Sequence, residues 1–279
     1  MILSGKARLA GVIGWPVGHS RSPALHGYWL QHYGIDGAYI PLPVPPERFA
    51  DVLRVLPAMG FRGANVTVPH KETALALADE VDPAARRIGA VNTLVLRPDG
   101  SILGRNTDAF GFIANLRQCS PDWRPDAGPA VVVGAGGAAR AVVVALLDAG
   151  VAEVRLVNRT LARAEAVAAD LGGPVSVMAW EDRAAALSGA GVLVNSSTLG
   201  MTGQPPLTLP LDALPVTATV CDIVYAPLET PLLAAAARRG NPVADGLGML
   251  LHQARPGFEA WFGLLPEVTP ELRRFLEDR

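Results

Sequence analysis

The chain has 279 residues, of which 50% are hydrophobic and 18% are charged, and its formal net charge is −2. This apolar content excludes global disorder. The charge is close to neutral and no basic block is present, so the composition does not indicate binding to nucleic acid or to a membrane surface. No stretch reaches the ~18 uncharged apolar residues of a membrane span. The first residues lack a signal-peptide pattern and are interpreted as mature sequence. Cys119 and Cys221 are far apart in sequence, which argues against a disulfide scaffold and predicts a reducing, cytoplasmic setting.

The first part of the chain, residues 1–107, alternates strand-like and helix-like segments. One helix is expected after Ser22, interpreted as its N-cap, and another from Pro69. The turn Pro98-Asp99-Gly100 predicts a hairpin. The predicted strands are 8–14, 38–44, 63–68, 90–96 and 101–104, and the predicted helices are 23–33, 46–57 and 69–78, with a further helix over 108–118 that leads away from this part. This mixture predicts an N-terminal α/β domain.

The turn-rich segment PDWRPDAGP, residues 121–129, separates this part from a more regular one. Strands are then predicted over 130–133, 153–157, 175–178, 192–196 and 219–223, and helices over 137–149, 161–171, 247–263 and 270–277. The β-branched run AVVV is typical of a parallel strand that is buried on both faces. The alternation predicts a doubly wound, Rossmann-like nucleotide-binding sheet.

A glycine-rich turn follows the AVVV strand and opens a predicted helix. Gly134, Gly136 and Ala139 have the G-x-G-x-x-G/A spacing. The first glycine permits the tight turn, the second lets the backbone approach a pyrophosphate, and the alanine allows close helix–strand packing. A turn without a ligand is the alternative, but the position between strand and helix favours a dinucleotide site. The residues expected to contact the cofactor here are Gly134, Ala135, Gly136, Gly137 and Ala138.

The end of the next strand indicates which dinucleotide binds. An NAD site usually has Asp or Glu there, ~20 residues after the glycines, to bind the ribose hydroxyls. This chain instead has Asn158, Arg159 and Thr160. An arginine pairs with a 2′-phosphate that a carboxylate would repel, so NADP is the predicted cofactor. The alternative is a helix-capping turn with a solvated arginine, and Thr160 can serve as N-cap in either case.

Polar side chains gather near the strand ends of the first part. Ser20 and Ser22 are hydroxyls on a turn, which can bind a carboxylate, although plain N-capping is the alternative. Asn65 and Thr67 occupy alternate positions of a strand, and Lys71 follows at a helix start. Further polar residues are Asn92, Asn106, Thr107 and Asp108. Such groups can bind a small polyhydroxylated ligand, although turns and solvated surfaces favour the same residues.

Other chemistries find little support. The histidines and cysteines form no zinc-ligand pattern, so no metal is expected. The nucleophile-elbow motif GxSxG is also absent. Metal-assisted and acyl-transfer reactions are therefore not predicted.

Nine segments, taken together, resemble the shikimate dehydrogenase family. In chain order they are GWPVGHSRSPALH, NVTVPHK, GAVNTL, GRNTD, GAGGAAR, NRT, NSSTLGM, DIVYAPLETPLL and DGLGMLLHQA. The resemblance covers nearly the whole chain and implies an α/β protein of two domains. Residues 1–107 would form the substrate domain, completed by C-terminal helices over 246–279, and residues 108–245 the NADP-binding domain. The implied reaction is the NADP-linked, reversible reduction of 3-dehydroshikimate to shikimate, on the route to chorismate and aromatic amino acids.

The same resemblance implies roles for individual residues. Lys71 and Asp108 would form the catalytic pair. Ser20 and Ser22 would hold the substrate carboxylate. The remaining substrate contacts would be Thr67, Asn92, Tyr225 and Gln253, and Gly246 and Met249 would lie beside the nicotinamide.

Two residues depart from the resemblance, and two alternatives stay open. Gly27 stands where the family usually has Asn, and Pro256 predicts a kink or break after Ala254, close to Gln253. The alternatives are a quinate/shikimate dehydrogenase of broader specificity and a non-catalytic, ligand-sensing relative. The presence of both residues of the catalytic pair argues against the sensor. We expect a monomer or homodimer that binds a small-molecule substrate and neither nucleic acid nor a membrane.

Overall fold

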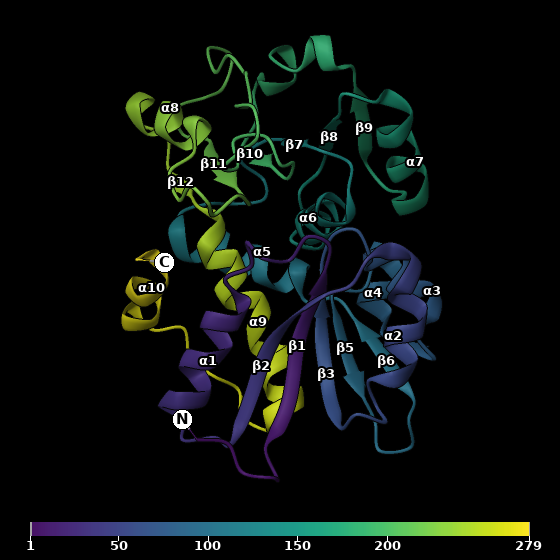
Figure 1. The fold of residues 1–279 in the computed structure, drawn as a ribbon. Helices are drawn as coiled ribbons and strands as arrows, with labels where there is room; N and C mark the ends of the chain where they lie inside the picture. The colour runs from purple at the N-terminus through teal and green to yellow at the C-terminus, as the bar shows by residue number, and fades with distance from the viewer. Residues whose placement is uncertain (1, 279) are drawn as a thin grey trace. The chain divides into compact units, whose positions relative to one another are not determined.

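The chain forms two compact units, drawn as ribbons in Figure 1. The computed structural model describes residues 2–278. The second unit is the continuous segment Asp108–His252, whereas the first comprises the described residues up to Thr107 together with those from Gln253 onward. The first unit is therefore assembled from two separate stretches of sequence.

The first unit contains a six-stranded mixed sheet of order β2-β1-β3-β5-β6-β4. Its strands are β1 (Arg8–Gly14), β2 (Gly37–Pro43), β3 (Phe61–Val66), β4 (Glu80–Val81), β5 (Thr93–Leu96) and β6 (Ile102–Arg105). β1 is parallel to β2 and β3, whereas β5 is antiparallel to β3 and β6. The C-terminal ends of β1, β3 and β6 therefore lie at the same edge of the sheet as the start of β5.

Helices from both stretches of sequence pack in the first unit. They are α1 (Ser22–His32), α2 (Phe49–Val55), α3 (Lys71–Leu77), α4 (Pro83–Ile88), the later part of α9 (Gly246–Phe262) and α10 (Pro270–Glu277). The buried indole of Trp261 on α9 donates from Nε1 to the Leu94 carbonyl oxygen at 2.9 Å. Trp29 on α1 donates to the Glu267 carbonyl oxygen at 3.0 Å, just before α10, which lies beside α1 in Figure 1. The C-terminal segment thus completes the core of this unit.

The second unit contains a six-stranded sheet of order β12-β11-β10-β7-β8-β9, in which every pair is parallel. The strands are β7 (Ala130–Val133), β8 (Val154–Val157), β9 (Val175–Met178), β10 (Val192–Asn195), β11 (Thr219–Asp222) and β12 (Val243–Ala244), and the helices are α5 (Asp108–Cys119), α6 (Gly137–Asp148), α7 (Leu161–Leu171) and α8 (Pro231–Arg239). The strand order reverses between β7 and β10, which is where doubly wound sheets bind ligands. The predicted Rossmann-like fold is confirmed.

The central strand β7 shows why this sheet forms. Ala130 and Val132 are buried in one apolar cluster, and Val131 and Val133 are buried in another. Because successive side chains of a strand point to opposite faces, the two clusters lie on the two sides of the sheet. The prediction of a strand buried on both faces is confirmed.

Some local predictions are wrong. The N-cap of α1 is Arg21, and Ser22 is the first residue inside the helix, so Ser22 is not the cap. The helix predicted from residue 46 begins as the 3₁₀ helix Pro46–Arg48 before α2, and α3 begins at Lys71 rather than Pro69. Two short strands and α4 were not predicted. Asp82, whose carboxylate accepts from the Ala85 N–H at 2.6 Å, is an N-cap signal that would have located α4.

Of the kink or break expected after Ala254, the break does not occur, because α9 continues from Gly246 to Phe262 with Pro256 inside it. The residues that follow, Phe258, Trp261 and Phe262, are buried. Their packing offsets the single backbone hydrogen bond that a proline removes.

Candidate functional site

Backbone hydrogen bonds hold the predicted polar residues of the first unit at one edge of its sheet. The Thr67 N–H donates to the Ile13 carbonyl oxygen at 2.9 Å, which ties the segment after β3 to the end of β1. The Val91 N–H donates to the Lys71 carbonyl oxygen at 2.9 Å, and the Asn92 N–H donates to the Arg105 carbonyl oxygen at 3.0 Å. The start of α3, the segment before β5 and the end of β6 are thereby fixed to one another.

Asn92 is the centre of a buried polar cluster at this edge. Its Nδ2 donates to Thr107 Oγ1 at 3.0 Å and to Gln253 Oε1 at 3.3 Å. Its Oδ1 accepts from the Thr107 N–H at 2.9 Å and from the Thr93 hydroxyl at 2.9 Å. Asn92 and Gln253, which are 161 positions apart in sequence, are thus brought together as the resemblance implied.

Ser20 lies on the turn between β1 and α1, and Ser22 is the first residue of α1. The Ser22 N–H donates to Ser20 Oγ at 3.3 Å, which places the two hydroxyl-bearing residues side by side. Ser22 is buried, and its side chain makes no helix-capping bond. Burial raises the pKa of the buried Tyr39, and the Ser22 side chain opposes that rise.

The two residues of the predicted catalytic pair are placed in different units. Lys71 is the first residue of α3, after the N-cap residue His70, whose Nε2 lies 2.7 Å from the Val44 carbonyl oxygen. Asp108 is the buried first residue of α5. It directly follows Thr107, whose backbone N–H donates to Asn92 Oδ1. This hydrogen bond fixes the backbone immediately before α5.

The glycine-rich turn adopts the geometry that its spacing predicts. Gly134 has φ +120°, and a Cβ there would come within 2.8 Å of Ser196 Oγ, so only glycine fits. Gly136 is the N-cap of α6, and a Cβ on it would meet nothing within 4 Å, which leaves open space in front of the helix. The first N–H groups of α6 lack intrahelical acceptors and can bind a phosphate there. These residues fit a dinucleotide pyrophosphate.

The segment after β8 presents an arginine. Asn158 Nδ2 donates to the Thr160 carbonyl oxygen at 2.9 Å and closes the turn, while Arg159 and Thr160 are exposed. Thr160 holds the N-cap position of α7, but its side chain makes no capping bond. Within residues 2–278, Arg159 forms no ion pair, so its guanidinium is available to an anion.

The loop that carries Tyr225 is anchored by a buried network that the sequence did not predict. Asp222 accepts from Asn195 Nδ2 at 3.0 Å, from the Thr230 hydroxyl at 2.7 Å and from the Val224 N–H at 3.0 Å. Burial raises the Asp222 pKa from 3.8 to about 6. The segment containing Tyr225 is therefore held at both ends, at Val224 and at Thr230.

Gly246 and Met249 belong to the start of α9 in the second unit. A Cβ on Gly246 would come within 2.3 Å of the Ile223 carbonyl oxygen, so the backbone approaches that loop closely. Met249 is buried in the apolar cluster that also contains Val132. Both residues are thus packed next to the β11 segment and the core.

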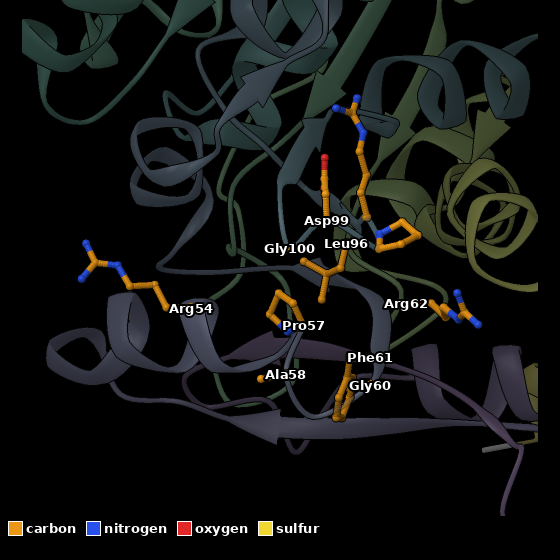
Figure 2. A pocket seen from close by; sticks show the side chains of 11 residues that line it. Arg54, Pro57, Ala58, Gly60, Phe61, Arg62, Leu96, Asp99 and Gly100 are labelled. Atoms are coloured by element: carbon orange, nitrogen blue, oxygen red, sulfur yellow. The ribbon is translucent and has the colours of Figure 1, made fainter.

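A surface pocket of about 520 Å³ lies at the other end of the first unit's sheet, by the start of β3 and the end of β5. Figure 2 shows the guanidinium groups of Arg54 and Arg62 on opposite sides and pointing away from one another. Arg97, also in the lining, pairs with Glu80 at 2.7 Å. These guanidinium groups do not point toward a common position, so the pocket lacks the arrangement of an anion-binding site.

Neither a metal-binding cluster nor a membrane-spanning helix is found in residues 2–278. No group of three or more His, Cys, Asp and Glu side chains could hold a metal ion. No helix in that range is long and apolar enough to cross a membrane.

The parallel sheet, its switch point and the glycine-rich turn define a dinucleotide-binding α/β protein. Comparison with known proteins identifies the family within this class. The family model described as "Shikimate dehydrogenase substrate binding domain" matches residues 12–94, and "Shikimate / quinate 5-dehydrogenase" matches residues 125–202. The chain is 66% identical to the shikimate dehydrogenase (NADP(+)) of Paramagnetospirillum magneticum, over 98% of this chain and 99% of that protein. The chain belongs to the shikimate dehydrogenase family, as the sequence motifs implied.

Solved structures agree with this assignment. Shikimate 5-dehydrogenase from Thermus thermophilus, solved with NADP(H) and shikimate, is 39% identical and has a TM-score of 0.84, with 97% of each chain covered. Quinate dehydrogenase from Corynebacterium glutamicum, solved with NAD, is 31% identical and has a TM-score of 0.90, with 98% of this chain and 99% of that chain covered.

Proposed function

We propose that this chain catalyses the NADP-linked, reversible reduction of 3-dehydroshikimate to shikimate. The observation that carries the proposal is the 66% identity, over 98% of the chain, to a shikimate dehydrogenase (NADP(+)). The site supports it physically, because the buried cluster of Asn92, Thr107 and Gln253 offers hydroxyl, amide and carbonyl groups to a polyhydroxylated ligand.

The substrate would be held by residues of the first unit. Ser20 and Ser22 would bind its carboxylate, since adjacent hydroxyls can donate to the same anion. Thr67, Asn92 and Gln253 would bind its hydroxyls. Tyr225, on the anchored loop of the second unit, would make a further contact.

NADP would be held by the second unit, and when bound as NADPH it supplies the hydride. The backbone of Gly134 to Ala138, with the first turn of α6, would bind the pyrophosphate. Arg159 would pair with the 2′-phosphate, beside Asn158 and Thr160, while Gly246 and Met249 would line the nicotinamide end.

The reaction requires a proton for the substrate oxygen. As the carbonyl carbon gains hydride, negative charge develops on the oxygen, and the Lys71 ammonium would stabilise that charge and donate the proton from Nζ. Asp108 would orient the ammonium group and the resulting hydroxyl. The product is the alcohol, and Lys71 regains its proton from solvent.

The test is NADPH oxidation with 3-dehydroshikimate, followed by the reverse reaction with shikimate and with quinate, each with NADP and NAD. Rapid turnover of the shikimate pair with NADP is expected. No turnover of any pair would favour the ligand-sensing alternative, and comparable turnover of quinate would favour the broader specificity that one family description includes.

We further propose a reducing, cytoplasmic setting, supported by Cys119 and Cys221, which form no disulfide bond. We also propose a monomer or homodimer, which light scattering of the purified protein would test.

A further inference from the structure

Helix α9 has two glycines in its first turn, Gly246 and Gly248. Glycine is a poor helix former, because it loses more backbone freedom on folding than any other residue. The first turn of α9 is therefore weak by its own composition. This turn nevertheless carries Gly246 and Met249, which the proposed function places at the nicotinamide, so contacts from other elements have to hold it.

Both glycines are required by close neighbours in the second unit. A Cβ on Gly246 would come within 2.3 Å of the Ile223 carbonyl oxygen, just after β11. A Cβ on Gly248 would come within 1.8 Å of Oδ1 and 2.6 Å of Cγ of Asn115, a residue of α5. The Asn115 amide therefore occupies the space that a side chain at position 248 would fill.

Asn115 is buried, and both ends of its amide have partners. Its Nδ2 donates to the Asp245 carbonyl oxygen at 2.7 Å, and its Oδ1 accepts from the Cys119 thiol at 3.4 Å, one turn further along α5. A backbone carbonyl can only accept, so Nδ2 must face Asp245, and Oδ1 is the atom that lies against Gly248. The bond to Asp245 ties α5 to the residue that precedes α9.

Asp245 connects this bond to the first turn of α9. Its Oδ1 accepts from the Leu247 N–H at 3.0 Å and from the Gly248 N–H at 3.4 Å, which are the donors that an N-cap side chain satisfies. Asn115 thus holds the backbone of the residue whose side chain caps the helix. It fixes the start of α9 through the capping residue and also by its contact with Gly248.

Apolar packing keeps Asn115 itself in place. Phe112 and Leu116, on either side of it along α5, are buried in the same apolar cluster as Met249. The two helices therefore share a core as well as the hydrogen bond from Asn115. A shift of the Asn115 backbone would disturb that core, so the amide is a rigid support.

We propose that Asn115 is a positioning residue, which holds the start of α9 so that Gly246 and Met249 can receive the nicotinamide of NADP. The inference rests on the proposed function, which assigns those two residues to the nicotinamide. The 2′-phosphate has a separate proposed contact, because Arg159 follows β8 and belongs to neither helix. Loss of the Asn115 amide should therefore disturb one half of the cofactor and leave the other half bound.

The first test is Asn115→Ala, with binding measured by calorimetry for NADPH and for adenosine 2′,5′-bisphosphate, which carries the 2′-phosphate but no nicotinamide. Kd for NADPH should rise ~3- to 10-fold, the effect of about one hydrogen bond, while Kd for the bisphosphate stays within about 2-fold of wild type. In turnover, kcat should fall ~10-fold or more, since hydride transfer depends on placement of the reacting atoms within about 1 Å.

Asn241→Ala is the matched control. Asn241 is also a buried asparagine of the second unit, and its Nδ2 donates to the Pro215 and Ala218 carbonyl oxygens at 2.8 and 2.9 Å. Neither partner belongs to α9. This variant should lose stability without changing the ratio of the two Kd values.

Gly248→Ala tests the same contact from the other side and provides the test if Asn115→Ala does not fold. The added Cβ displaces the Asn115 amide, so this variant should show the same selective loss of NADPH binding. In Asn115→Ala the amide is already gone. The double variant should therefore bind NADPH no more than about 2-fold more weakly than Asn115→Ala alone.

The outcomes separate the two proposals. A wild-type protein that binds NADPH but does not turn over the shikimate pair would overturn the proposed function, and the binding comparison, which needs no turnover, would still test Asn115. Unchanged binding and kcat in folded Asn115→Ala would overturn the positioning role, as would equal weakening of NADPH and the bisphosphate. The same selective loss in Asn241→Ala would trace the effect to stability and would also overturn it.

Discussion

Lys71 and Lys6 are the only lysines in the sequence, which gives the proposed proton donor a matched control. We predict that Lys71→Met lowers kcat by ~10²-fold or more, because methionine can neither give a proton nor stabilise charge on the substrate oxygen. KM for NADP should change little, since Lys71 belongs to the first unit and the glycine-rich turn to the second. Steady-state kinetics of Lys71→Met and of the control Lys6→Met checks this. Near wild-type turnover in Lys71→Met would remove the residue from the mechanism.

Arg159 should determine the choice of cofactor. Replacing it with alanine is expected to raise KM for NADP by roughly 10-fold, because one charge-assisted contact to the 2′-phosphate is lost at an exposed position. KM for NAD should stay the same, and discrimination by wild type should weaken as salt rises. The exposed Arg163→Ala, one turn into α7, is the control. The comparison is of kcat/KM for both cofactors, and a ratio that does not move would refute the role.

Asp222 predicts a pH dependence of stability. Its pKa is raised by burial from 3.8 to about 6, so the folded state binds this proton more tightly than the unfolded chain does. The group therefore lowers stability as pH rises from about 4 to about 6, and the loss is complete above that window. In Asp222→Asn, the fall in the free energy of unfolding between about pH 4 and about pH 7 should be smaller by about 2 to 3 kcal/mol. Urea unfolding at both pH values, with the exposed Asp212→Asn as control, measures it. Equal pH dependence in wild type and Asp222→Asn would contradict the assignment.

Helix α9 carries a proline in its interior, where the missing N–H and the ring should cost stability. Pro256→Ala is expected to raise the free energy of unfolding by about 1 to 2 kcal/mol, after allowance for the greater freedom of the unfolded chain. Pro270→Ala, in the first turn of α10 where proline is well placed, should give no such gain. Denaturant unfolding of the two variants decides this. A lower free energy of unfolding in Pro256→Ala would show that packing of the proline ring stabilises the fold.

The elements that could be predicted from the sequence are those whose conformation is determined by residues close to one another in the chain. The glycine-rich turn was found because Gly134 needs a positive φ and AVVV needs burial on both faces, and both requirements are visible within eleven residues. The buried hydrogen bond from the Tyr39 hydroxyl to Asn65 Oδ1 was not predicted, because the two residues are 26 positions apart and meet only when β1 inserts between their strands. The prediction of Ser22 as N-cap is wrong because the N-cap position is held by Arg21, which has no capping side chain that the sequence could reveal.

At the scale of the whole molecule, α9 passes from the second unit into the first between His252 and Gln253. If either unit unfolds, one part of this helix loses the side chains that it packs against. Short isolated helices are only marginally stable, so that part of α9 should unfold as well. We therefore predict one calorimetric transition rather than two. Trp261→Ala, which removes a buried indole of the first unit, should lower the midpoint of that transition without splitting it. Two resolved transitions in either protein would contradict this coupling.

The division of the first unit into two stretches of sequence affects folding during synthesis. The second unit, Asp108–His252, is continuous and can complete its sheet as soon as it leaves the ribosome. The first unit begins earlier but lacks the indole of Trp261, which bonds Leu94, and the segment that bonds Trp29 until the last residues emerge. Domains that are translated first usually fold first. In this chain we expect the reverse order, because part of the core of residues 2–107 stays uncovered until residues 253–278, beyond the second unit, have been translated.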